Sequence, residues 1–248
     1  MPHEDASVTE VPPGGATATR VDARGPVPGA GPAGRPSLGW TELLVAVVVY
    51  LGLSIGVGVL LLVALPGIVA VLAVTGLVTL AAAVIALALR VRSLPALGLR
   101  PTTATWLLLG VAGGVLGWLV NRVVIIGYIT LTGDLSNPQE PLATASAAFG
   151  WEFVGMLAAG AVLVPFAEEL LFRGVGYGAL RRYGVGIAVV ASSLVFGIAH
   201  GTNVVLPAAI VLGIITALLY ERSRSIWPGV VAHGLNNAIV FVSALILL

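Results

Sequence analysis

The stretch FGWEFVGMLAAGAVLVPFAEELLFRG, residues 149–174, decides the fold class. It contains an apolar run that is nearly long enough to cross a membrane, and this run continues directly into charged residues. A helix needs about 20 apolar residues to cross a bilayer. The rest of the chain has the same character, since 58% of its 248 residues are hydrophobic and 9% are charged. A soluble domain carries about 25% charged residues. The sequence therefore predicts an all-α, polytopic transmembrane helical bundle.

About seven apolar segments are long enough to be read as spans. They are Leu43–Leu65, Ile68–Leu89, Thr105–Leu131, Phe149–Phe166, Ile187–Ala199, Val204–Tyr220 and Val230–Leu247. The fourth is predicted to continue as helix toward Arg181, and the fifth is the shortest. Small residues at Gly-xxx-Gly spacing let helix backbones approach closely. We expect such packing at Gly110/Gly114, Gly113/Gly117 and Gly174/Gly178.

Composition narrows the classes of partner and chemistry. The net charge is +1, so no basic surface indicates a nucleic-acid partner. The chain has no cysteine, which excludes disulfides, thiol catalysis and Cys-ligated zinc. The lipid bilayer is the partner that the composition itself predicts.

The arginines predict the orientation. They cluster at Arg20/Arg24/Arg35, Arg90/Arg92/Arg100, Arg181/Arg182 and Arg222/Arg224. With seven spans, all four clusters fall on one side of the membrane, which the positive-inside rule makes cytoplasmic. The N-terminus is then cytoplasmic and the C-terminus external.

Three ionisable residues, Glu168, Glu169 and Arg173, follow directly on the fourth span. A charge at the centre of a membrane helix costs about 2.5–3.5 kcal/mol, so the three would cost about 8 kcal/mol if unpaired. Glu169 and Arg173 stand four residues apart, so they share a helix face and are predicted to form an ion pair. Glu168 points about 100° away from Glu169, which leaves its carboxylate available for chemistry.

Two further segments place polar side chains in apolar surroundings. His200 ends the fifth span, four residues after Phe196, while His233 and Asn237 share one face of the last span, next to Asn236. Such groups on separate spans can form a catalytic site, but ion and proton pathways use them too.

Other intramembrane protease chemistries lack their residues here. The chain has no His-Glu-x-x-His segment for the zinc type, and Asp134, in a loop, is the one aspartate beyond the first 36 residues. Ser192 and Ser193 lack the Gly-x-Ser context of the serine type. A glutamate-plus-histidine chemistry remains.

The motif residues stand in a recognisable order along the chain. They form Glu168-Glu169-x-x-x-Arg173, Phe196-x-x-x-His200 and His233-x-x-x-Asn237. This order and spacing resemble the CPBP family, the CAAX-protease and bacteriocin-processing intramembrane endopeptidases, also called the type II CAAX prenyl endopeptidase or abortive-infection family. LGLRP, Leu97–Pro101, is similar to a stretch often found before the third span.

The resemblance implies an intramembrane endopeptidase, classed with the metallopeptidases, that acts on a peptide or membrane-protein substrate. The catalytic residues it implies are Glu168 with His200 to activate a water, Glu169 with Arg173 to support the site, and His233 with Asn237 to form the oxyanion hole. Glu168, His200 and His233 are also the candidates for a metal, because two histidines and a carboxylate can hold zinc with an open position. The cofactor prediction stays open between zinc and none.

The predicted organisation has two parts. Residues 1–36 form a disordered, Pro/Gly-rich tail that holds seven of the 15 prolines. Residues 37–248 form a transmembrane CPBP-like protease domain with a motif core at 148–248. The resemblance points to a bacterial plasma membrane. Two other functions are left open: a catalytically idle scaffold or immunity protein on the same fold, and a proton-coupled transporter.

Overall fold

The structure is a computed structural model that describes residues 27–30, 37–64, 67–136, 140–147 and 150–247. Across these ranges every regular element is helical, which confirms the predicted all-α class. The longer helices are α1 (Trp40–Ala64), α2 (Ile68–Leu89), α3 (Ala104–Thr132), α8 (Val185–Ala199), α9 (Val205–Ser223) and α10 (Trp227–Leu247). Two short elements join them, η1 (Leu94–Leu97) and α4 (Glu140–Ala147).

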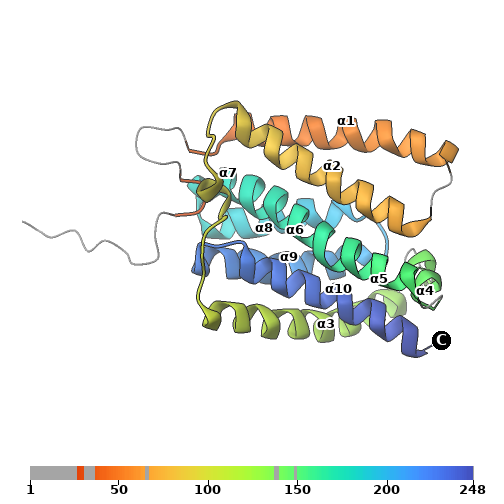
Figure 1. Ribbon diagram of the computed structural model, residues 1–248. Helices are drawn as coiled ribbons and strands as arrows, with labels where there is room; N and C mark the ends of the chain where they lie inside the picture. Colours follow the sequence, from red (N-terminus) through yellow and green to blue (C-terminus); the bar gives the residue numbers. More distant parts are fainter. Residues whose placement is uncertain (1–26, 31–36, 65–66, 137–139, 148–149, 248) are drawn as a thin grey trace, which may run out of the picture.

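One continuous helical rod, Trp151–Tyr183, runs through the middle of the bundle (Figure 1). Its successive segments are α5 (Trp151–Met156), η2 (Leu157–Leu163), α6 (Val164–Glu168), η3 (Glu169–Tyr177), α7 (Gly178–Leu180) and η4 (Arg181–Tyr183). The predicted continuation of the fourth span toward Arg181 is therefore confirmed. However, η2 and η3 are π-helical, whereas a regular α-helix was expected.

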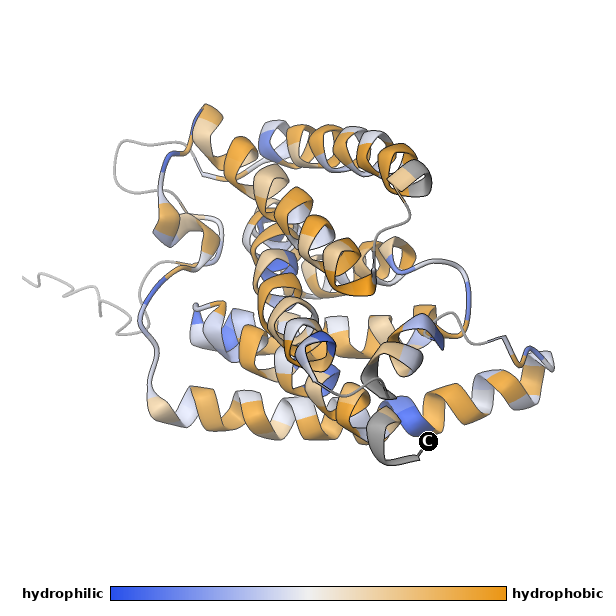
Figure 2. Cartoon of the chain, turned by 45° about the vertical axis from the view of Figure 1, so that its right-hand side comes forward, coloured by the Kyte–Doolittle hydropathy of each residue, from blue (hydrophilic) through white to orange (hydrophobic). Residues whose placement is uncertain are grey.

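Within the described residues, five helices are long and apolar enough to cross a membrane: α1, α2, α3, the central rod and α9. The fifth predicted span is α8, whose 15 residues reach about 22 Å, short of the roughly 30 Å hydrocarbon core. The seventh is α10, which stays a predicted span. Figure 2 shows that apolar residues predominate along the long helices. Leu108, Val123 and Leu131, for example, are 68%, 71% and 88% exposed, so these surfaces suit contact with lipid.

The glycine spacing in α3 lets this helix pack closely on α10. A Cβ added at Gly110 would lie 2.6 Å from the carbonyl oxygen of Pro228, and one added at Gly114 would lie 2.6 Å from that of Ala232. Both distances are far shorter than ordinary contacts, so a larger side chain would push the two backbones apart. The close packing predicted for this pair of glycines is confirmed.

The arginine-bearing loops that the structure describes lie together at one end of the bundle (Figure 1). Ser225 Oγ donates a hydrogen bond to the carbonyl oxygen of Arg100 at 2.9 Å, and the Ile226 N–H donates to that of Gly98 at 3.0 Å. Gly98 has φ 78° and lies against the ring of Tyr220, so the LGLRP stretch needs a glycine there. The remaining cluster lies outside the described residues: Arg20, Arg24 and Arg35.

Most of the predicted tail, residues 1–36, also lies outside the described residues. Residues 27–30 are described, and the carbonyl oxygen of Gly29 accepts a hydrogen bond from the Leu38 N–H at 2.9 Å. Gly29 also lies against the backbone of Gly178. The boundary at residue 36 and its disorder remain predictions.

Candidate active site

The two glutamates stand at the junction of α6 and η3, near the middle of the bundle. Glu168 is 7% exposed and Glu169 is 0% exposed. Both are therefore removed from bulk solvent, where an ionised carboxylate needs a partner. Their different partners give the two side chains different chemistry.

Glu169 forms the predicted ion pair with Arg173, with Arg173 Nη1 3.3 Å from Glu169 Oε1. Arg173 is fully buried. Its Nη2 donates to the carbonyl oxygen of Gly213 at 3.1 Å, and its guanidinium lies 4.4 Å from the ring centre of Phe196. The cation is thus held by a carboxylate, a carbonyl and an aromatic face.

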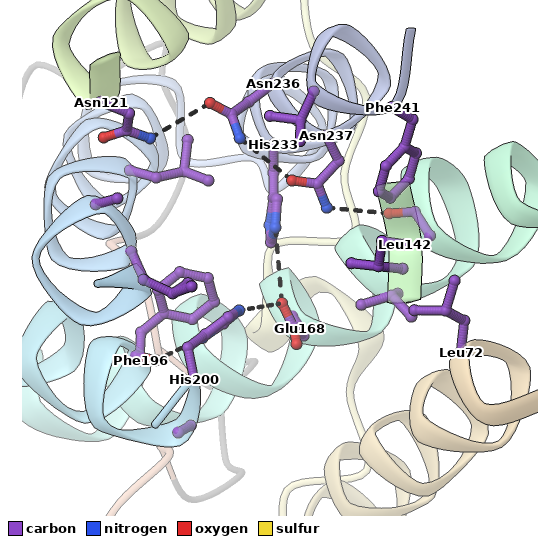
Figure 3. A pocket seen from close by; sticks show the side chains of 18 of the residues that line it. Leu72, Asn121, Leu142, Glu168, Phe196, His200, His233, Asn236, Asn237 and Phe241 are labelled. Atoms are coloured by element: carbon purple, nitrogen blue, oxygen red, sulfur yellow. Dashed lines mark hydrogen bonds and ion pairs between the residues drawn. The ribbon is translucent and has the colours of Figure 1, made fainter. Parts of the chain in front are cut away.

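His200 caps the end of α8 and turns one ring nitrogen toward Glu168 (Figure 3). Its Nδ1 lies 2.8 Å from the carbonyl oxygen of Phe196. Because a carbonyl only accepts hydrogen bonds, Nδ1 carries the hydrogen. The other nitrogen, Nε2, lies 3.9 Å from Glu168 Oε2, and in the neutral ring it bears the free lone pair. The spacing Phe196-x-x-x-His200 therefore fixes the tautomer of the histidine.

His233, on α10, lies between the two carboxylates. Its Nδ1 is 3.1 Å from Glu169 Oε1, and its Nε2 is 3.7 Å from Glu168 Oε2. Only 2% of the residue is exposed, and its ring stands edge-on to Phe196 at 5.5 Å. The sequence did not predict a histidine shared by both glutamates, since the pairing depends on how α10 packs against the central rod.

Asn237 compensates for a proline in the central rod. Pro165 has no N–H, so it cannot donate to Ala161, four residues earlier, or to Gly160, five residues earlier in a π-type register. The Nδ2 atom of Asn237 donates to the carbonyl oxygen of Gly160 at 3.0 Å. Gly160 belongs to η2, and a Cβ added at Gly234 would lie 2.5 Å from the Ala161 carbonyl oxygen. The close approach of α10 therefore gives the widened helix segment a hydrogen-bond partner.

A row of amides continues from Asn237 toward α3 (Figure 3). Asn236 Nδ2 donates to Asn237 Oδ1 at 3.2 Å, and Asn121 Nδ2 lies 3.5 Å from Asn236 Oδ1. Asn121 and Asn236 are each 6% exposed. Asn121 was not among the predicted site residues, although an asparagine in the middle of an apolar span was a visible signal.

These side chains line a cavity of about 290 Å³ between the helices. Four of the predicted site residues contribute to its wall: Glu168, His200, His233 and Asn237. Glu169 and Arg173 are not in the wall but lie behind it, in contact with His233 and with each other. The structure thus brings all six predicted residues together. It also adds Tyr50 of α1 and Arg122 of α3 to the cavity wall.

The candidates for a metal are Glu168, His200 and His233. Their nearest nitrogen–oxygen separations are 3.7 and 3.9 Å. Across the described residues, no group of three or more His, Cys, Asp or Glu side chains is arranged to hold a metal ion. The prediction stays open between zinc and no metal, and no step below is assigned to a metal.

Comparison with known proteins supports the resemblance seen in the motifs. Residues 150–239 match the family described as type II CAAX prenyl endopeptidase Rce1-like. This range contains all six predicted site residues, so the likeness to the CPBP membrane proteases is confirmed over this part of the chain.

One curated relative is the "Putative membrane peptidase YdiL" of Bacillus subtilis (strain 168), which is 32% identical to this chain over 91 residues. The aligned part is 36% of this chain and 37% of the relative. No solved structure matches the chain. The family match, at residues 150–239, thus covers the central rod, α8, α9 and most of α10, and α1, α2 and α3 lie outside it.

Proposed function

We propose that the protein is an intramembrane endopeptidase that hydrolyses peptide bonds of peptide or membrane-protein substrates. The observation that carries the proposal is the convergence of Glu168 with His200 and His233 on the wall of one cavity. These residues come from three separate helices, and each would be costly in a membrane without such a role.

Glu168 and His200 are suited to activate a water. Their 3.9 Å separation is too long for a direct hydrogen bond, but a water could bind both at ordinary lengths. Within the described residues, Glu168 Oε2 has no hydrogen-bond partner. In the proposed step, the water oxygen bonds to the substrate carbonyl carbon and its proton passes to Glu168. The same proton then passes to the leaving amine as the carbon–nitrogen bond breaks.

Glu169 and Arg173 would act by positioning His233. The carboxylate of Glu169 receives the hydrogen bond of His233 Nδ1, and Arg173 balances the charge of that carboxylate. His233 Nε2 is then held on the cavity side, where it could donate to the developing oxyanion when protonated. An oxyanion donor typically contributes about 2.7–4 kcal/mol to the transition state.

Asn237 is the second proposed oxyanion donor. One of its N–H groups is engaged with the Gly160 carbonyl oxygen, and an asparagine amide has two N–H donors. The second is available to substrate because Asn237 lies in the cavity wall. In this reading Asn237 both supports η2 and donates to the oxyanion.

The experiment that tests the function compares Glu168→Gln with the native protein. Purified protein in lipid nanodiscs would be incubated with a synthetic peptide mixture, and new chain ends would be identified by mass spectrometry. We expect cleavage to fall by about 10²–10⁴-fold in the variant, which is the usual contribution of a general base. Glu152→Gln is the matched control, because Glu152 lies on the same rod and is exposed.

The outcomes separate the candidate functions. Unchanged cleavage in Glu168→Gln would refute the role of that carboxylate. No cleavage by the native protein would favour an idle scaffold or a transporter instead. Proton uptake into liposomes that depends on Glu168 would single out the transporter.

The proposed location is a bacterial plasma membrane, with the arginine-bearing end of the bundle in the cytoplasm. The chain has no cysteine, so one introduced at Arg182 would be the unique thiol. We expect a membrane-impermeant maleimide to label it only after the cells are opened. Labelling from outside intact cells would reverse the proposed orientation.

A further inference from the structure

Arg122 is a charged residue in the middle of a membrane span. It lies on α3, and the helix continues through apolar residues to Thr132. Leu131, about two and a half turns further along, is 88% exposed. A side chain this apolar and exposed suits contact with lipid. Arg122 therefore stands between apolar, exposed residues on both sides of it along the helix, such as Leu119 and Ile126.

Arg122 has no carboxylate partner in the described part of the chain. Ion pairs are found there for three arginines other than Arg122. These are Arg90, Arg173 and Arg181, and each lies within 3.3 Å of a glutamate oxygen. The contact found for Arg122 is aromatic, with its guanidinium 5.9 Å from the ring centre of Trp118. Arginines in membrane spans are almost always paired or face a water-filled cavity. Arg122 is itself exposed, so its guanidinium is available to an anion that the described residues do not supply.

The side chain lies where two cavities adjoin. One is the 290 Å³ cavity that contains Glu168, and the other has a volume of about 380 Å³ and extends toward Leu135 and Ser136. Six described residues line both: Arg122, Ile125, Leu142, Val205, Val240 and Phe241. Arg122 is the one charged residue among these six. A molecule that reaches Glu168 from the larger cavity would pass its guanidinium.

Electrostatics favour an anionic group at this point. The carboxylate of Glu168 in the cavity wall and that of Glu169 behind it are balanced by one guanidinium, that of Arg173. A negative group on the substrate would be repelled there but attracted by Arg122. Arginine also matches a carboxylate better than lysine does, because its planar group can donate two parallel hydrogen bonds.

We propose that Arg122 binds a carboxylate carried by the peptide substrate and thereby selects which peptide bond lies at Glu168. The inference rests on the proposed endopeptidase function, which it deepens by naming a chemical feature of the substrate. The carboxylate could belong to an acidic side chain or to the end of the peptide. Arg122 binds substrate in this view and takes no part in bond breaking.

The test uses short internally quenched peptides that differ at one position, which holds Glu, Gln or Lys, each made with a free or an amidated C-terminus. A charge-assisted hydrogen bond contributes enough for the native protein to favour the preferred acidic peptide by roughly tenfold or more in kcat/KM. We expect Arg122→Gln to lose this preference while the neutral peptide is still cleaved. Arg122→Glu should reverse it and favour the Lys peptide. The Gln and amide series show whether the side chain or the chain end is bound.

Arg222→Gln is the matched control, because it also removes one arginine but Arg222 lies near the end of α9 and lines neither cavity. Its peptide preference should equal that of the native protein.

The same assays in nanodiscs with and without phosphatidylglycerol test a lipid phosphate as the anion. If the effect of Arg122→Gln follows the anionic lipid and not the peptide charge, the proposal is wrong. It is also overturned if native protein cleaves Glu and Gln peptides equally and, in addition, cleaves peptides with free and amidated C-termini equally. The endopeptidase function would survive both results, whereas native protein that cleaves no peptide would refute that function itself.

Discussion

The glutamate–arginine pair of the candidate site, Arg173–Glu169, differs from the pair Arg181–Glu221 near the arginine-bearing end, which we call the end pair. Arg181 donates to Glu221 through Nε at 2.8 Å and Nη2 at 2.9 Å, and the Tyr177 hydroxyl donates to the same carboxylate at 2.7 Å. In the site, Arg173 Nη1 lies 3.3 Å from Glu169. The end pair has the short, two-bonded geometry of a structural ion pair.

The site pair leaves hydrogen-bonding capacity unused. Within the described residues, Arg173 Nε and Nη1 and Glu169 Oε2 have no hydrogen-bond partner. Both residues are fully buried, whereas the side chains of Arg181 and Glu221 are 24% and 12% exposed. A buried polar network that is only partly satisfied costs stability. The end pair joins η4 to α9, and the poorer geometry of the site pair fits the proposal that this pair holds His233.

The largest predicted effect on stability is that of Arg173→Ala. Removing the guanidinium leaves Glu169 buried without its cation, which should cost about 3–5 kcal/mol, and cleavage should fall as well because His233 loses its support. Thermal unfolding in detergent, with activity measured well below the transition, would show both effects. An unchanged melting temperature would mean that the pair is hydrated or absent.

A smaller effect is predicted for Arg181→Ala. Because this pair is partly exposed, water can solvate Glu221 once its partner is gone, and the loss of stability should be about 1 kcal/mol. Cleavage should be unchanged, since Arg181 lies outside the cavity wall. A drop in activity as large as that of Arg173→Ala, at equal amounts of folded protein, would show that the two pairs do not differ in role.

The smallest predicted effect is that of chelation. The unused hydrogen-bonding atoms of the site suit water, so Glu168 and His200 are expected to act on it without tightly bound metal. Activity after exhaustive chelation should therefore equal that of untreated protein, and metal analysis of the active enzyme should find no stoichiometric zinc. One equivalent of zinc that is lost together with activity, and restores it when added back, would make His200 and His233 ligands.

Much of the fold could be predicted from the sequence, because hydropathy is a local property. The predicted spans lie on helices that begin and end within a few residues of the expected positions, as for α2 at Ile68–Leu89. The pairing of Glu169 with Arg173 was also predictable, since the two lie on one helix. Arg122 was visible as a charge within an apolar span, and an accounting of every ionisable residue in the spans would have found it.

The sequence alone determined the membrane class and the order of the helices, and it predicted six polar residues that the structure brings together, because apolar length and motif spacing are properties of the chain itself. Tertiary structure decided how those residues meet. The placement of His233 between two carboxylates, the use of Asn237 to satisfy the Gly160 carbonyl and the position of Arg122 between two cavities all depend on contacts among α3, α10 and the central rod. Such contacts are fixed by the packing of side chains between helices far apart in sequence, which periodicity along a single helix does not encode.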